Sequence, residues 1–103
     1  MSPVTFINIF TIDTDQVDAF LAGWRERAAF MSRQPGFRSF RLHRALTPDT
    51  PFQLVNVAEW DSVEALKAAT AQPFFRESVQ RSIDEFNVTA HPAIYSIDIE
   101  ERG

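Results

Sequence analysis

Residues 37–60 read FRSFRLHRALTPDTPFQLVNVAEW, and this stretch decides the fold that we predict for the whole chain. Its centre, residues 47–51 (TPDTP), has the composition of a turn, because proline fixes φ and aspartate bonds to nearby backbone. The apolar runs on either side are therefore expected to pair as antiparallel strands. A constant index sum then pairs Leu46 with Phe52, Arg44 with Leu54, Leu42 with Asn56, Phe40 with Ala58 and Arg38 with Trp60.

One face of this predicted hairpin is apolar except at its centre. The two-residue period of a strand places six large side chains on it, namely Phe40, Leu42, Leu46, Phe52, Leu54 and Trp60. Asn56 lies in the middle of the same face. A carboxamide in such surroundings costs about 1–3 kcal/mol unless a partner bonds it. The partner of Asn56 is therefore the central question about function.

Length and charge narrow the class of protein. The chain has 103 residues, which predicts a single domain over residues 1–103. Its formal net charge is −4 and no basic cluster exceeds a pair, so we expect no nucleic-acid partner. No cysteine is present, which removes disulfides, thiolate nucleophiles and thiolate metal sites.

Aromatic content and hydropathy point to a protein with an aromatic interior. Ten phenylalanines are many for this length and indicate an aromatic-lined core or cavity.

The first residues, MSPVTF, show no basic region ahead of an apolar segment. No apolar run approaches the ~18 residues of a membrane span. We therefore expect no membrane partner and a cytoplasmic location.

The first predicted strand covers residues 4–12 and is apolar at both parities. Val4, Phe6, Phe10 and Ile12 share one side, together with Asn8. Ile7 and Ile9 occupy the other side, so both faces of this strand are expected to be covered.

A helix is predicted to follow from residue 13 or 14. Asp13 or Thr14 can cap it, with Gln16 completing a capping box on Asp13. Apolar residues recur with a 3.6-residue period at Val17, Phe20, Leu21, Trp24, Ala28 and Met31, and residues 34–36 (QPG) end the helix. We interpret this stripe as core packing, with a ligand contact at Trp24 as the alternative.

Two more helices and a strand are predicted after the hairpin. Asp61 is expected to cap a short helix over residues 62–71, with Glu64 reaching back to it. Gln72-Pro73 interrupts this helix, and a second helix follows in which Phe75, Val79, Ile83 and Phe86 recur at helical spacing. A last strand is predicted over residues 90–99.

The order β-α-β-β-α-β predicts an α+β ferredoxin-like fold, in which helices cover one face of a four-stranded antiparallel sheet. Apolar residues remain on the second face of the first and third strands, namely Ile7, Ile9, Val55 and Val57. An exposed patch of that kind favours burial against another surface. We therefore predict a homodimer whose sheets pack face to face and close a barrel.

Common chemical motifs are absent from the sequence. Three glycines provide no phosphate-binding loop, no dinucleotide fingerprint and no nucleophile elbow. His43 and His91 are the only imidazoles, and their spacing matches no metal-ligand pattern, so we expect no metal. The register places His43 on the face opposite Asn56, which favours a role at the dimer contact, although a near-neutral pKa makes histidine a candidate base.

The sequence resembles the antibiotic biosynthesis monooxygenase family of dimeric α+β barrels. The similarity rests on residues 56–60 (NVAEW), on 34–37 (QPGF), on 42–44 (LHR) and on the element order. In the family's cofactor-independent members, which oxidise polycyclic phenols to quinones, the Asn and Trp of an Asn-x-x-x-Trp motif line the substrate cavity. The resemblance therefore implies catalytic roles for Asn56 and Trp60. It also places Leu66 where those members have a tyrosine, and Arg81 near their basic residue.

Two other branches of that family give different expectations. The heme-degrading members carry an Asn that matches Asn8, but Ala69 and Val79 stand near their Trp and axial His. Valine cannot ligate iron, so we do not expect heme degradation. A further branch acts as isomerases, and nothing in the sequence excludes that activity.

The function that we predict is a cofactor-independent monooxygenase that oxidises a small aromatic or enolic molecule with O₂. Asn56 would orient the substrate anion, Trp60 would form the wall and a second donor, and Asn8 would join them on the helix-covered face. Asn8, Trp24, Leu66 and Arg81 are the predicted substrate-binding residues. The alternatives are a non-catalytic small-molecule-binding dimer and an isomerase or lyase that uses His43 as base. Asn8 and Asn56 bonding only each other or a buried water is the structural alternative.

Overall fold

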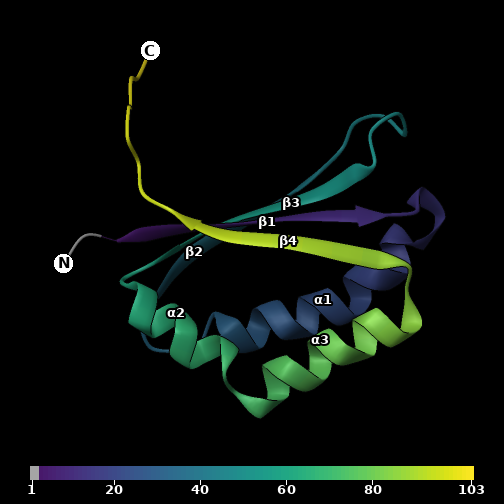
Figure 1. Cartoon of the computed structure of the whole chain (residues 1–103), viewed down its shortest axis with the longest axis horizontal. Helices are drawn as coiled ribbons and strands as arrows, with labels where there is room; N and C mark the ends of the chain where they lie inside the picture. Colours follow the sequence, from purple (N-terminus) through teal and green to yellow (C-terminus); the bar gives the residue numbers. More distant parts are fainter. Residues whose placement is uncertain (1–2) are drawn as a thin grey trace.

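Four antiparallel strands form one sheet, and all helices lie against one of its faces (Figure 1). The computed structural model describes residues 3–103, so residues 1 and 2 of the predicted domain lie outside the described part. The strands are β1 (Val4–Ile12), β2 (Phe37–Arg44), β3 (Phe52–Trp60) and β4 (Val88–Tyr95). The helices are α1 (Val17–Met31), α2 (Val63–Thr70) and α3 (Pro73–Glu85).

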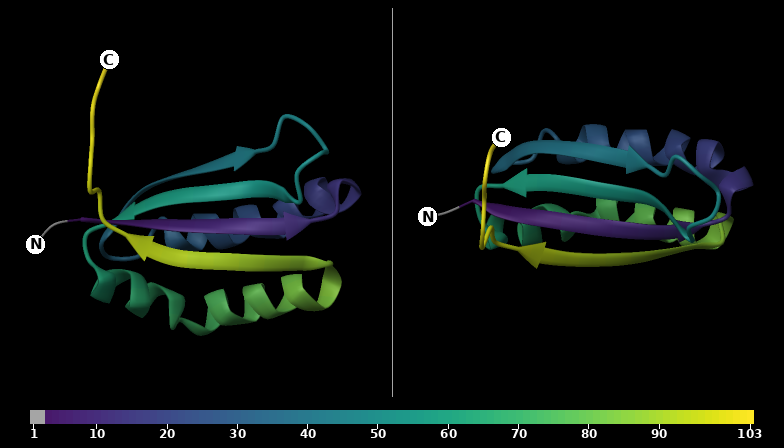
Figure 2. Two further views of the ribbon diagram at one scale, coloured as in Figure 1. Left: turned by 45° about the horizontal axis from the view of Figure 1, so that its top comes forward. Right: turned by 90° about the horizontal axis from the view of Figure 1, so that it is seen from above.

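The strand order is β2-β3-β1-β4, with β1 and β3 in the centre (Figure 2). Every observed pairing is antiparallel. This arrangement confirms the predicted α+β ferredoxin-like fold. The two central strands are also the two that carry apolar residues at both parities, as a strand with both faces covered requires.

The predicted register of the hairpin is confirmed through its middle and wrong at both ends. Phe40 pairs with Ala58, and Leu42 pairs with Asn56. At the start of β2 the register shifts, so that Phe37 rather than Arg38 pairs with Trp60. An extra residue in one strand bends that strand locally, as in a β-bulge.

At the turn, the prediction that Leu46 and Phe52 face each other inside the core is wrong. Leu46 lies beyond the end of β2 and is fully exposed, and Phe52 is half exposed. The buried Gln53 side chain explains the difference, because its Nε2 donates to the carbonyl oxygens of Thr47 and Thr50 at 3.0 and 2.7 Å. These bonds hold the loop in a wide conformation, and the ladder ends where Ala45 N donates to Gln53 O.

Both predicted capping boxes are wrong, although the helices that they introduce are present. A short 3-10 turn, Thr14–Gln16, precedes α1, and no side chain caps it. The Gln16 Oε1 atom instead accepts from the backbone N–H of Asn87, which ties the start of α1 to the chain ahead of β4. At α2 the cap is Ser62, whose Oγ accepts from Ala65 N at 3.1 Å. Asp61 forms an ion pair with Arg38 instead.

The ends of the remaining elements follow the sequence signals closely. Gly36 ends the connection after α1 with a φ of +87°, a conformation that favours glycine. α3 begins at a proline, where the missing N–H is tolerated. β4 begins and ends earlier than predicted, so residues 96–103 leave the sheet on the side away from the helices (Figure 1).

The core between sheet and helices consists of two clusters. One cluster contains Phe10, Ile12, Val17, Phe20, Trp24, Ala28 and Leu54. The other contains Ala58, Trp60, Leu66 and Ala69. Along β1 and β3 the residues that separate the two clusters on this face are Asn8 and Asn56.

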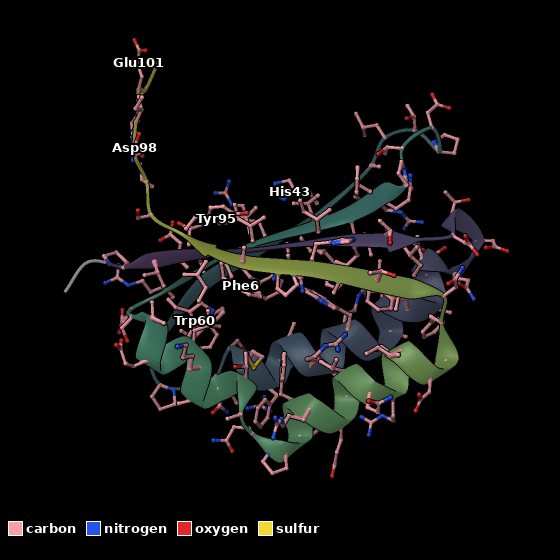
Figure 3. All side chains as sticks on the ribbon, in the orientation of Figure 1. Phe6, His43, Trp60, Tyr95, Asp98 and Glu101 are labelled. Carbon is pink, nitrogen blue, oxygen red and sulfur yellow. The ribbon has the colours of Figure 1, made fainter. Side chains whose placement is uncertain are left out.

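Within residues 3–103, no helix lies on the opposite face of the sheet (Figure 1). Figure 3 shows His43 and Tyr95 on this outer face, while Phe6 and Trp60 lie between the sheet and the helices. The apolar residues of the central strands that point outward are only partly buried: Ile7, Ile9, Val55 and Val57. The homodimer expected from this surface stays a prediction. Within residues 3–103, no helix has the length and apolar character needed to cross a membrane.

Candidate active site

A cavity of about 660 Å³ lies between the sheet and the helix layer. This volume falls within the ~300–1,000 Å³ that is typical of small-molecule sites. Aromatic side chains make up much of its wall: Phe6, Phe10, Phe20, Trp24, Phe37, Phe40, Trp60 and Phe75. The aromatic cavity predicted from the phenylalanine content is therefore present.

Asn8 and Asn56 lie opposite each other on the sheet side of this cavity, on strands β1 and β3. Ala45 N donates to Gln53 O, so the backbone groups of Gln53 point toward β2. Because this direction alternates from residue to residue along a strand, the backbone N–H and C=O groups of Asn56 point toward β1. Asn8 and Asn56 are then a pair joined by backbone hydrogen bonds, with Cα atoms roughly 5.5 Å apart. On its other side Asn8 pairs with Pro92, which has no N–H to donate.

The carboxamide oxygens of this pair are unsatisfied. The Oδ1 atoms of both Asn8 and Asn56 are buried, and neither has a hydrogen-bond partner within the described residues. The two amides therefore do not bond each other through these oxygens. Buried polar groups without partners are rare in native proteins, and each such group calls for an explanation. Here both amides line a cavity large enough for a guest molecule.

Trp60, Trp24 and Leu66 also line the cavity, as predicted for site residues. Trp60 is 2% exposed and packs edge-on against Phe37, with ring centroids 5.4 Å apart. Trp24 packs in the same way against Phe40 at 5.3 Å. Each of these side chains therefore belongs to the core and to the cavity wall at once, and the two interpretations of the Trp24 stripe are not exclusive.

Arg27 is a cavity residue that the sequence analysis missed. It lies on α1, is only 7% exposed and lines the cavity, and its Nη2 atom donates to Ser82 Oγ on α3 at 3.5 Å. The signal was present in the sequence, because Arg27 stands three residues after Trp24 and four before Met31 on the apolar stripe. A charged residue on such a stripe usually faces solvent, and here it faces the cavity.

Burial and the neighbouring Arg81 lower the pKa of Arg27 from its ordinary value to about 10. The guanidinium therefore stays positively charged at neutral pH. No carboxylate within residues 3–103 forms an ion pair with it. Buried charges are normally paired, so an unpaired buried guanidinium is an unusual feature of this wall.

Two other predicted site residues lie outside the cavity. Arg81 is exposed on α3, close enough to affect the pKa of Arg27 but not among the lining residues. His43 is exposed on the outer face of the sheet, and its Nδ1 atom lies 3.3 Å from the Val55 carbonyl oxygen. Within one subunit, His43 is therefore separated from the cavity by the sheet (Figure 3).

The ionisable residues of the cavity wall are all basic. Arg27 and Lys67 contribute positive charge, and no aspartate, glutamate, histidine, cysteine or tyrosine of the described chain lines the wall. The cavity is thus positive within a protein whose formal net charge is −4. Its remaining polar side chains among the described residues are the amides of Asn8 and Asn56, the hydroxyls of Thr70, Ser82 and Thr89, and the indole N–H groups of Trp24 and Trp60.

The fold and the site together define a class of small ferredoxin-like proteins with an aromatic, amide-bearing cavity between sheet and helices. Comparison with known protein families identifies this class. Residues 3–81 match the family described as antibiotic biosynthesis monooxygenase. The chain belongs to the antibiotic biosynthesis monooxygenase family. The resemblance found in the sequence is confirmed.

Individual relatives agree with this assignment. The chain is 39% identical over 72 residues to deoxynogalonate monooxygenase of Streptomyces nogalater, a match that covers 70% of this chain and 58% of that protein. The crystal structure of SnoaB, a cofactor-independent oxygenase from Streptomyces nogalater, is 29% identical, covers 97% of each chain and gives a TM-score of 0.81. Rv0793 from Mycobacterium tuberculosis, at 19% identity, 98% and 100% coverage and a TM-score of 0.79, shares the fold. Family and relatives support a monooxygenase-type function.

Proposed function

We propose that this protein is a cofactor-independent monooxygenase that oxidises a flat aromatic or enolic small molecule with O₂. The observation that carries the proposal is the pair of amides, Asn8 and Asn56, which line an aromatic cavity and whose buried Oδ1 atoms have no hydrogen-bond partner within the described residues. The likeness to SnoaB, a cofactor-independent oxygenase, supports the same conclusion.

The reaction needs only the substrate and O₂. An acidic CH₂ group beside a phenol or enol loses a proton, and the resulting anion passes one electron to O₂. The substrate radical and superoxide combine through a C–O bond, and the protonated hydroperoxide then loses water to leave a carbonyl group. One oxygen atom of O₂ enters the product and the other leaves as water, so the electrons balance without an external reductant.

The residues of the cavity would hold and stabilise the anion rather than react covalently. The amide N–H groups of Asn56 and Asn8 are donors that can bond a phenolate or enolate oxygen, and they are fixed in place by the central strands. Trp60 provides an aromatic wall and, in this proposal, the second donor through its indole N–H. Burial of the substrate excludes bulk water and strengthens each of these interactions.

Among the described residues the wall has no carboxylate or imidazole to act as base, so in this proposal a single water molecule admitted beside the substrate would take the proton. The positive charges of Arg27 and Lys67 would favour the ionised substrate by lowering its pKa. An isomerase or lyase mechanism that relies on His43 receives no support from this geometry, because His43 is on the other face of the sheet. The remaining alternative is a binding dimer without chemistry.

Oxygen uptake with dithranol, a hydroxylated anthrone, tests the proposal. The wild-type protein is expected to consume O₂ well above the rate of autoxidation and to place one ¹⁸O atom from ¹⁸O₂ in the product. Asn56→Ala should lower kcat/KM by roughly 10²–10³, the usual effect of removing a preorganised donor to an oxyanion. Asn87→Ala is the matched control, since Asn87 is exposed beyond α3 and should leave the rate unchanged.

Two outcomes would reject the enzymatic function. If Asn56→Ala consumes O₂ as fast as the wild type, the amide pair has no catalytic role. If the wild type binds aromatic molecules but never exceeds autoxidation across a panel of anthrones, naphthols and quinols, the binding dimer is the better description.

A further inference from the structure

Arg27 has the position and the charge of a ligand-binding residue that the oxidation chemistry does not require. It stands on the helix side of the cavity, whereas Asn8 and Asn56 stand on the sheet side. The residue is buried, with only 7% of its surface exposed. A guanidinium has five N–H donors, and within residues 3–103 the one side-chain bond that Arg27 makes is to Ser82 Oγ at 3.5 Å.

The protein groups around Arg27 disfavour its positive charge. Each carboxylate that forms an ion pair within residues 3–103 does so with another arginine, namely Arg38, Arg44 or Arg102. Arg81 lies near enough to repel it, and burial removes water from it. A negative ligand is the one addition to this wall that would satisfy the charge and the free donors together.

We propose that Arg27 and the Ser82 hydroxyl form a receptor for a carboxylate carried by the ligand. The proposal rests on the proposed function for the identity of the reacting end, and it adds that the substrate is an aromatic or enolic carboxylate. The reacting oxygen lies at the amide pair on the sheet, and the carboxylate lies at the helix layer. A planar guanidinium can bond both carboxylate oxygens at once, which would also fix the orientation of the flat ring.

Ser82 takes part as a donor in the occupied site. It is 8% exposed on α3 and faces Arg27 on α1, so both residues are held by the packing of these helices. Its hydroxyl oxygen accepts from Arg27, and its hydrogen can donate to a carboxylate oxygen. Lys67 on α2 also lines the cavity and is exposed, so it adds positive charge at the entrance.

The binding of two probes of the same shape, one negatively charged and one neutral, tests the proposal without turnover. 2-Naphthoate and 2-naphthamide share shape and aromatic surface and differ in charge. Calorimetric titration should give the wild type at least a 10-fold lower Kd for 2-naphthoate than for 2-naphthamide. Arg27→Gln should remove this preference, Arg27→Lys should retain most of it, and Ser82→Ala should reduce it several-fold.

Arg25→Gln is the control, because Arg25 is exposed on the same helix and should leave the preference unchanged. Thermal unfolding of each variant checks that it is folded, and Arg27→Lys covers the case in which Arg27→Gln does not fold. Equal affinity of the wild type for both probes, no binding of either at millimolar concentration, or a preference that survives in Arg27→Gln would overturn the proposal. Since no O₂ uptake is measured, a failed oxygenase assay and a failed carboxylate receptor give separate results.

Discussion

Asn8 and Asn56 are direct partners across strands β1 and β3, yet their carboxamide oxygens are both buried without a hydrogen bond. Two amides side by side would ordinarily bond each other, and that bond was the structural alternative to a role in ligand binding. In the observed arrangement that bond is not formed, and both residues line the cavity.

A double-mutant cycle separates these two situations. Asn8→Leu and Asn56→Leu are each expected to raise the free energy of unfolding by about 1–2 kcal/mol, because each removes an unsatisfied polar group from an apolar wall. Because the two carboxamides do not bond each other, the coupling energy between the two changes should be small, about 0.5 kcal/mol, which is the low end of the range for neighbouring residues. Urea unfolding of the singles and the double measures both quantities. Destabilisation by each single change, with strong coupling, would show that the amides bond each other.

Arg27 is expected to lower the stability of the empty protein. Arg27→Met keeps the length and the apolar contacts of the side chain and removes a buried charge, so the free energy of unfolding at pH 7 should rise by about 1–3 kcal/mol. The pKa of Arg27 is lower in the folded than in the unfolded state, so the unfolded chain binds more protons once the pH exceeds about 10. The wild type should therefore recover stability relative to Arg27→Met as the pH passes 10.

Unfolding by urea at pH 7, 9 and 10.5 follows this difference. Arg25→Met serves as the reference, because the side chain of Arg25 is exposed and its removal should change stability by less than about 0.5 kcal/mol. A loss of stability in Arg27→Met at pH 7 would show that the guanidinium is paired in solution.

The pH dependence of turnover should follow the substrate rather than the protein. The described cavity wall contains no aspartate, glutamate or histidine that could act as a base with a pKa near neutrality. We therefore expect the midpoint of the kcat/KM profile to move with the pKa of the substrate across a series of substituted anthrones. A midpoint that stays fixed across the series would reveal a protein base.

The outer face of the sheet is expected to join two copies of the chain. Sedimentation should give a mass near twice 11.8 kDa at micromolar concentration. Val57→Glu places a charge among the outward apolar residues of the central strands and should yield a monomer. Ala22→Glu adds the same charge on the exposed side of α1 and should leave the mass unchanged. A wild-type monomer would contradict the predicted barrel.

Much of the fold follows from periodicity, and the errors arise where one side chain competes with the local pattern. The spacing of Asn56 and Trp60 on one strand parity was sufficient to place both on the cavity side. Gln53, Ser62 and Gln16 form specific hydrogen bonds that decided the turn and the helix starts, and composition does not choose between such partners. Arg27 was missed because only the apolar residues of α1 were assigned to the buried side of the helix, although Arg27 lies on the same side.

The rung formed by Asn8 and Asn56 divides the interior into two hydrophobic clusters with a void between them. A flat guest seated there would touch both clusters and join them into one continuous interior. Uptake of the molecule would then be the last step of folding as well as the first step of catalysis. With the ligand bound, the protein should unfold as a single cooperative unit. Amide hydrogen exchange should then be slowest in the strands that line the ligand site.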